Sequence, residues 1–199
     1  MHRSTFFSVR YTLGMAGRRR TFDRDAVLRM AMRAFWERGY DGVSVAQVCA
    51  EAGIAAPSLY AAFGDKNALF EEACALYTAH LDEDLERDLA APTAREAVER
   101  LLRSSAEHFT APGQPPGCLV MGEPRLAERR EKTRAAIRAR LRRAAGEGEF
   151  ASAGEADAVA AFVDTVLTGM AAQARDGADR ARLLDAARYA ALAWPAAAA

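Results

Sequence analysis

Residues 53–70 of this chain read GIAAPSLYAAFGDKNALF, and they directly follow the run VAQVCAEA at residues 45–52. Ser44 precedes that run and stands three positions before Gln47, which is the spacing of a capping box at the start of a helix. Gly53 tolerates the left-handed conformation that ends a helix, and the proline shortly after it fits the first turn of a new one. The sequence therefore predicts two short helices that meet across a tight turn.

A further helix is expected on each side of this pair. Asp23 is a suitable N-cap for a helix whose apolar residues follow the 3.6 period and which ends at Gly39. Asp65 is a suitable N-cap for a long helix that continues toward the acidic run at residues 82–88. The first three helices have too small a core to be stable alone, so we expect them to pack firmly against the rest of the chain.

This arrangement resembles the N-terminal domain of the tetracycline-repressor (TetR) family of transcriptional regulators. The family pattern contains F-x-x-x-G-Y, then A-G-V/I, then L-Y-x-x-F-x-x-K-x-x-L. The matching residues are, in order, Phe35, Gly39, Tyr40, Ala52, Gly53, Ile54, Leu59, Tyr60, Phe63, Lys66 and Leu69. The resemblance implies an all-α fold, with an N-terminal three-helix helix-turn-helix DNA-binding domain and a C-terminal helical ligand-binding and dimerisation domain.

Domain limits are implied by the same resemblance. Residues 1–20 would be a flexible basic arm, residues 21–66 the helix-turn-helix domain, and residues 67–199 the effector-binding and dimerisation domain. The family pattern begins near Met15, so residues 1–14 are expected to be either a disordered leader or the product of an overcalled start codon.

The implied function is that of a ligand-responsive, sequence-specific repressor that a small-molecule effector releases from a palindromic operator. The expected partners are double-stranded DNA, a second copy of the chain and a small effector, with no membrane and no cofactor. Two alternatives stay open. One is a thiol-based redox or electrophile sensor that uses Cys118, and the other is a helical protein that has lost DNA binding.

Charge is distributed unevenly along a chain whose formal net charge is +0. Residues 1–67 hold 10 Lys+Arg and 6 Asp+Glu, whereas the remainder holds 17 and 21. A basic N-terminal part suits contacts with phosphate. Its densest charge is the run Arg18, Arg19 and Arg20, which either reaches phosphates or a minor groove or forms a solvated tail.

The resemblance also assigns DNA contacts. Tyr60 and Lys66 match positions that hold phosphates, although Tyr60 could instead only pack, and Ser44 starts a helix whose terminus meets the backbone. The second helix of the pair should expose mainly small residues, namely Ala55, Ala56, Pro57, Ser58, Ala61 and Ala62. Methyl groups contact thymine but cannot make the bidentate bonds that discriminate bases by ~1–3 kcal/mol. Specificity should therefore depend on Gln47, Ser58, the arginine run and DNA shape.

Composition argues against several other classes of protein. With 199 residues, 51% of them hydrophobic, the chain can bury a core without disulfides. Its three cysteines, Cys49, Cys74 and Cys118, lack metal-ligand spacing, and an odd count suits a reducing compartment. No apolar run reaches the ~18 residues of a membrane helix, so a cytoplasmic location is expected. No catalytic motif accompanies the histidines, so we expect no enzyme.

Cys118 follows Gly117 in the segment GCLVMGEP, residues 117–124, and this segment resembles the stretch beside the effector cavity in many family members. At a helix N-terminus the dipole would favour the thiolate and lower the pKa of the thiol, as a sensor requires. The opposing interpretation is a small buried residue that lets helices approach each other closely.

Helical periodicity also indicates candidate residues for the effector pocket and for the dimer interface. The effector pocket is expected to involve Tyr77, Phe109, Cys118, Met121 and Phe162, each of which could equally be plain core. The dimer interface is expected at Phe162, Val166, Gly169, Met170, Leu183, Ala187, Ala190 and Trp194, where the alternative is a core within one chain. A dimer would place two reading helices one turn of DNA apart, about 34–36 Å.

A basic segment between Arg125 and Arg143 contains nine Lys+Arg and two Glu. Charge runs of this kind usually form a solvated face, and here we expect that face to pair with the acidic run at residues 82–88. The other interpretation, a second contact with DNA, conflicts with the family habit of reading DNA with the N-terminal domain.

Overall fold

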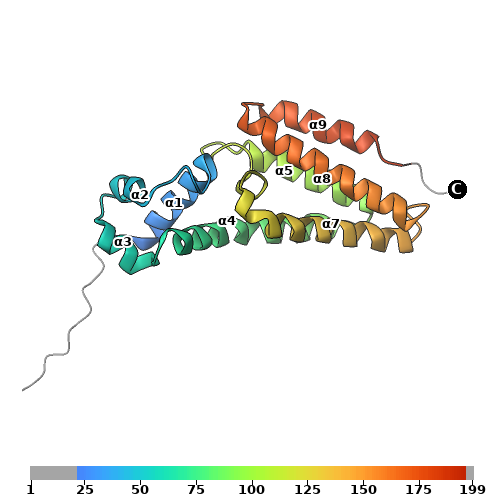
Figure 1. Cartoon of the computed structure of the whole chain (residues 1–199). Coiled ribbons are helices and arrows are strands. Elements are labelled where there is room, and N and C mark those ends of the chain that lie inside the picture. The colour runs from blue at the N-terminus through green and yellow to red at the C-terminus, as the bar shows by residue number, and fades with distance from the viewer. Residues whose placement is uncertain (1–21, 196–199) are drawn as a thin grey trace, which may run out of the picture.

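The computed structural model describes residues 22–195, and within this range the chain forms α-helices, one 3-10 helix and no strand. The predicted all-α fold is confirmed. The molecule is elongated, with three short helices at one end and the C-terminal helices toward the other (Figure 1). The run Arg18 to Arg20 lies outside the described residues, so its role stays a prediction.

The first three helices, called the head below, begin and end largely as local chemistry predicts. They are α1 (Arg24–Arg38), α2 (Val45–Ala52) and α3 (Ala56–Phe63). Asp23 accepts hydrogen bonds from two backbone N–H groups at the start of α1. The capping box of Ser44 and Gln47 is complete at the start of α2, and Gly53 ends that helix with φ of 64°. These predicted boundaries are confirmed.

The core of the head continues directly into α4 (Lys66–Leu89). Phe35 of α1 is fully buried and meets the ring of Phe70 edge-on at 5.1 Å between centroids. The next residue of α1, Trp36, meets the ring of Tyr77 at 4.7 Å. Because Phe70 and Tyr77 both belong to α4, α1 lies along the long helix that enters the rest of the molecule.

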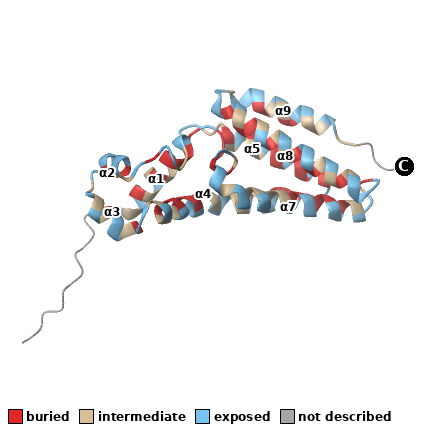
Figure 2. Cartoon of the chain, in the orientation of Figure 1, coloured by how far each residue is buried: buried red, intermediate tan, exposed pale blue. Residues whose placement is uncertain are grey.

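The remaining helices form the part of the molecule called the body below. They are α5 (Ala94–Phe109), α6 (Leu119–Gly122), η1 (Pro124–Leu126), α7 (Ala127–Gly146), α8 (Ala153–Arg175) and α9 (Arg180–Leu192). Helix α7 packs against α8, and α5 packs against α4, α8 and α9. Buried residues gather on the facing sides of these helices, while the outer sides are exposed (Figure 2).

The basic segment becomes α7, and several of its arginines pair with neighbouring helices. Arg129 pairs with Asp82 in the acidic run of α4, as predicted, and Arg134 binds Asp164 of α8 at 2.9 Å. The prediction of a solvated face is wrong at Arg140, whose side chain is buried. Its guanidinium donates to the carbonyl oxygens of Leu89 and Ala91 at 3.0 and 3.1 Å, because the C-terminal end of α4 leaves carbonyls without helical partners.

Candidate functional site

Helix α3 turns its large apolar residues inward and a face of small residues outward. Leu59 and Phe63 are buried, whereas Tyr60 is 49% exposed. Of the predicted reading face, Ala55, Pro57 and Ala61 are exposed and Ala56, Ser58 and Ala62 are partly exposed. The face is therefore accessible, and Tyr60 supplies its one large side chain with a polar tip.

The capping box restricts what Gln47 can offer to a ligand. Its Oε1 accepts the backbone N–H of Ser44 at 2.8 Å, and the Ser44 hydroxyl accepts the backbone N–H of Gln47 at 3.2 Å. Both residues are exposed. Since the oxygen of Gln47 is engaged, its amide N–H groups are left to donate, and these suit acceptors such as phosphate oxygens or the purine N7.

Two cations lie against the ring of Tyr40, in the turn after α1. The Lys66 ammonium lies 4.0 Å from the ring centroid and the Arg125 guanidinium lies 3.8 Å from it. Lys66 is the first residue of α4, where the partial positive charge of the helix terminus adds to its own. Lys66 and Arg125 thus bring two positive charges to the turn after α1, beside the start of α4.

Arg24 is a residue of the head that sequence reasoning missed. Its guanidinium binds the carboxylate of Glu72 at 2.6 Å, donates to the carbonyl oxygen of Ala62 at 3.3 Å and lies over the ring of Phe63. Arg24 therefore ties the C-terminal end of α3 to both α1 and α4. No sequence motif marks this role, because the partners lie 38 and 48 residues away.

The carboxylate of Glu123 joins the head to the body. It is buried, and it accepts the backbone N–H of Tyr40 at 2.8 Å and that of Arg125 at 3.0 Å. Arg130 fixes the same segment by donating to the carbonyl oxygens of Val120 and Glu123 at 2.8 and 2.6 Å. The short stretch from α6 to η1 is thus held on one side by α7 and on the other by the turn after α1.

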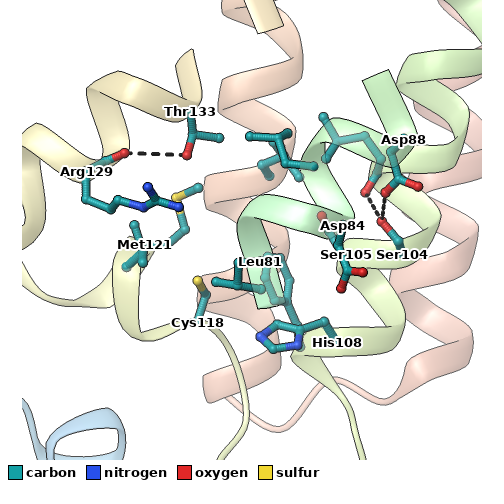
Figure 3. Close-up of a pocket in the computed structure, with 15 residues that line it drawn as sticks. Leu81, Asp84, Asp88, Ser104, Ser105, His108, Cys118, Met121, Arg129 and Thr133 are labelled. Carbon is teal, nitrogen blue, oxygen red and sulfur yellow. Dashed lines mark hydrogen bonds between the residues drawn. The ribbon is translucent and has the colours of Figure 1, made fainter. Parts of the chain in front are cut away.

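A cavity opens beside this stretch, between α4, α5, α6 and α7 (Figure 3). Three of the predicted pocket residues, Phe109, Cys118 and Met121, line it. Tyr77 lies behind this wall and reaches the cavity only through its contacts with Cys118 and His108. The prediction that Phe162 lines the cavity is wrong, because that ring is 42% exposed on the outer side of α8.

Sequence reasoning missed the polar part of the lining. Ser105 and His108 come from α5, Asp84 from α4, and Arg129 and Thr133 from α7. The apolar stripes of these helices were visible in the sequence, but a stripe does not show which polar residues border an internal space. The pairing of Arg129 with the acidic run is the signal that could have placed α7 at the cavity.

Tyr77 connects Cys118 with His108. Its hydroxyl lies 3.4 Å from Sγ of Cys118 and 2.9 Å from Nε2 of His108, and it accepts the backbone N–H of Leu119 at 3.3 Å. Burial raises the pKa of the Cys118 thiol and lowers that of the His108 imidazole, despite the opposing effect of Asp84 on the histidine. Both groups are therefore neutral near pH 7.

The expected low pKa of Cys118 is thus corrected. The helix that it caps, α6, has only four residues, and burial outweighs the groups that favour the thiolate. The Cys74 thiol, on α4, is likewise deactivated, because burial and the nearby carboxylates of Glu123 and Glu71 raise its pKa to about 12. The structure favours the alternative interpretation, in which Cys118 is a small buried residue.

The outer face of α8 and α9 carries a shallow apolar groove. It is lined by Phe162, Val166, Gly169, Met170, Gln173, Ala186, Tyr189 and Ala190. Tyr189 is 61% exposed. Trp194 lines a neighbouring groove with Phe162 and packs against Phe150. Three of the predicted interface residues, Met170, Leu183 and Ala187, are buried within the chain, although Met170 also borders this groove, so their part in a dimer interface stays a prediction.

None of the helices within residues 22–195 is long and apolar enough to cross a bilayer. Within the same residues, no three side chains of His, Cys, Asp or Glu are grouped closely enough to bind a metal ion.

The helix-turn-helix head, the exposed α3 face and the all-helical body together define a protein of the helix-turn-helix DNA-binding class. The profile described as "Bacterial regulatory proteins, tetR family" matches residues 27–73. A solved structure of the TetR family regulator CifR, a cysteine mutant complexed with operator DNA, is 40% identical, with a TM-score of 0.81 over 90% of this chain and 100% of that chain. This chain belongs to the TetR family of transcriptional regulators.

Two other relatives extend the comparison. The transcriptional repressor ComR of Escherichia coli strain K12 is 28% identical over 193 residues, which are 90% of this chain and 92% of ComR. The repressor BdcR of the same strain is 37% identical over 108 residues, which are 53% of this chain and 54% of BdcR. The similarity to CifR and ComR spans nearly the whole chain, including the body with its cavity.

Proposed function

We propose that this chain is a sequence-specific repressor that binds a near-palindromic operator as a homodimer and is released from it by a small-molecule effector. The observation that carries the proposal is the 40% identity, over nearly the full chain, to CifR, whose structure was solved with a 26bp operator duplex. The exposed face of α3 agrees with this function, because it offers a surface that fits a major groove.

Residues 21–66, which contain the head, would hold the DNA, and residues 67–199 would hold the effector and the second protomer. The residues that we propose for DNA contact are Arg18, Arg19, Arg20, Ser44, Gln47, Ala55, Ala56, Pro57, Ser58, Tyr60 and Lys66. We assign different roles to them. Lys66 and Tyr60 would bind phosphates, and the small residues of α3 would let its backbone approach the bases.

The second protomer would cover the groove on α8 and α9. An apolar groove beside the exposed rings of Phe162 and Tyr189 is the kind of surface that association buries. Two-fold symmetry would then pair each groove with its copy and place two α3 helices about 34–36 Å apart on one side of the duplex.

The effector would act through the segment that joins the cavity to the head. Cys118, Val120 and Met121 line the cavity, and Glu123, only two residues further, holds the backbone of Tyr40 at 2.8 Å. A ligand that displaces α6 would therefore move the head relative to the body. A coupling of about 1–3 kcal/mol is typical of such switches and would weaken operator binding about 5- to 150-fold.

The test is selection of bound duplexes from a random DNA library at a fixed salt concentration. We expect a near-palindromic site to be enriched. Lys66→Met should weaken binding to that site and reduce the slope of log affinity against log salt concentration by about one. Lys132→Met, on α7, should change neither quantity. If no sequence is enriched above background, the repressor proposal fails and the alternative of a protein that has lost DNA binding is favoured.

Other functions receive less support. TetR family members are transcriptional regulators, and we propose that this chain is not an enzyme. A thiol sensor based on Cys118 would need a reactive thiolate, whereas burial raises the pKa of this thiol. A regulator acts where its DNA is, which is the basis for proposing a cytoplasmic location.

A further inference from the structure

We infer that the cavity between α4, α5, α6 and α7 takes a small uncharged molecule that carries one hydrogen-bonding group, such as a short alcohol, aldehyde, ketone or ether. This inference rests on the proposed ligand-responsive function and names the chemical class of its effector.

The cavity is small and mostly apolar. Its apolar lining consists of Leu81, Leu85, Leu101, Phe109, Val120, Met121 and Leu167. Its volume is about 90 Å³. A cavity of about 150 Å³ accepts benzene, so this one suits a still smaller molecule. Burial of apolar ligand surface against these side chains would supply most of the binding free energy.

The charged groups in the lining already have partners. Asp88 accepts a hydrogen bond from the hydroxyl of Ser104 at 2.5 Å, and Asp84 pairs with Arg87 at 2.7 Å. Arg129, the cation of the lining, pairs with Asp82. A ligand charge would therefore enter an apolar space without a free counter-ion, and burial of an unpaired charge is costly.

His108 adds no charge. Its Nε2 lies 2.9 Å from the Tyr77 hydroxyl, and its ring stacks on that of Trp36. Burial lowers the pKa of this imidazole, so it is neutral at pH 7. An anion would consequently find no positive partner on this wall of the cavity.

Two hydroxyl groups of the lining remain available to a ligand. Within residues 22–195, the Ser105 hydroxyl has no hydrogen-bond partner, and the Thr133 hydroxyl makes only a long bond of 3.4 Å to the carbonyl oxygen of Arg129. These residues come from α5 and α7 (Figure 3). A hydroxyl can both donate and accept, so either residue could bind the oxygen of an alcohol or a carbonyl.

An ammonium ion is the main competitor among ligand classes, because two carboxylates, those of Asp84 and Asp88, border the cavity. The Asp84 side chain offers little to an ammonium ion. It is 47% exposed and pairs with the guanidinium of Arg87, so water and that cation already stabilise its charge. Asp88 is buried, but its short bond to Ser104 engages one of its oxygens. The experiment must therefore compare uncharged, cationic and anionic probes directly.

The probes are butan-1-ol, butylamine and propionate, which are similar in size and differ in charge at pH 7. Each is titrated into the full-length protein while the methyl resonance of Met121, assigned with Met121→Leu, is followed by NMR. The methyl group of Met30, on α1, reports non-specific solvent effects. We expect butan-1-ol to shift the Met121 resonance with a Kd of ~1 mM and to bind about tenfold more tightly than either ion.

A Ser105→Ala variant tests the hydrogen bond. We expect it to weaken binding of butan-1-ol roughly fivefold, in line with the loss of one neutral hydrogen bond, while the spectrum elsewhere shows an intact fold. Tighter binding of propionate or butylamine, or no shift of Met121 with butan-1-ol, would overturn the inference.

These outcomes separate the inference from the proposed function. If butan-1-ol binds beside Met121 without weakening operator binding, the ligand class is supported and the ligand-responsive function fails for this ligand. If the protein selects an operator but its cavity binds only a charged probe, the repressor proposal stands and the ligand class is wrong.

Discussion

Helices α2 and α7 are fixed in place by different kinds of contact. Helix α2 begins at a capping box in which Ser44 and Gln47, three residues apart, satisfy each other's backbone N–H groups. Helix α7 has no side-chain cap at its start, and its Arg140 instead binds carbonyl oxygens 51 and 49 residues away. The start of α2 thus depends on short-range chemistry, whereas the position of α7 depends on contacts that exist only once the fold has formed.

The largest effect should come from Arg140. Arg140→Met removes the donors that satisfy buried carbonyl oxygens at the end of α4, so we expect a loss of about 3 kcal/mol in the free energy of unfolding, measured with urea. Arg142→Met is the matched control, because Arg142 pairs with Asp157 on an exposed surface, and it should change stability little. Equal losses of stability in the two variants would show that the buried contacts of Arg140 do not hold α7 in place, which would contradict the comparison between α2 and α7.

The same difference explains how far the sequence alone could predict the molecule. Helix starts at Asp23, Ser44 and Asp65 were predictable, because a capping residue acts on N–H groups within three residues of itself. The role of Arg140 was not, because its spacing in a basic run is that of a solvated face. Burial and charge pairing across helices require the three-dimensional arrangement.

The candidate sites divide in the same way. The exposed face of α3 was predictable because the helix period and the family anchors fix which side of a short helix turns inward. The cavity was predictable only in part. Periodicity showed that Phe162 lies on an apolar stripe, but it could not show that this stripe faces outward from α8, away from the cavity.

Glu123 tests the contact between the two regions. Glu123→Ala leaves the backbone N–H groups of Tyr40 and Arg125 without their acceptor, so we expect a loss of about 2 kcal/mol in stability and faster hydrogen exchange at the Tyr40 amide. Glu123→Gln keeps one acceptor oxygen and should lose less than half as much. Unchanged hydrogen exchange at the Tyr40 amide in the alanine variant would show that the packing of α1 on α4 holds the head in place without this contact.

Ser44 tests the short-range contacts that start α2. Ser44→Ala removes the cap of α2 and should lower stability by about 1 kcal/mol. Ser152→Ala, which removes the corresponding cap of α8 in the body, should cost a similar amount. The two variants should differ in DNA binding, which only Ser44→Ala should weaken, because α2 belongs to the head. A loss of DNA binding in Ser152→Ala would show that the two regions are not independent in this respect.

His108 should give the smallest effect of the four, and it lies where head and body meet, stacked on Trp36 of α1 with an angle of 13° between the rings. Burial holds the pKa of its imidazole below the ordinary value of 6.5. Between the lower folded pKa and 6.5, the unfolded chain binds more protons at this position than the folded chain does. Stability should therefore be fully present above pH 6.5 and decrease as the pH falls through this range.

The measurement that isolates this contribution is urea unfolding at pH 7.5 and at pH 5.5 for three proteins. His108→Gln should reduce the loss of stability on acidification, whereas His80→Gln should leave it unchanged, because His80 is exposed. An unchanged loss in His108→Gln would assign the pH dependence to other groups. A reduced loss would mean that protonation of this partly buried ring weakens the contact between α1, α4 and α5.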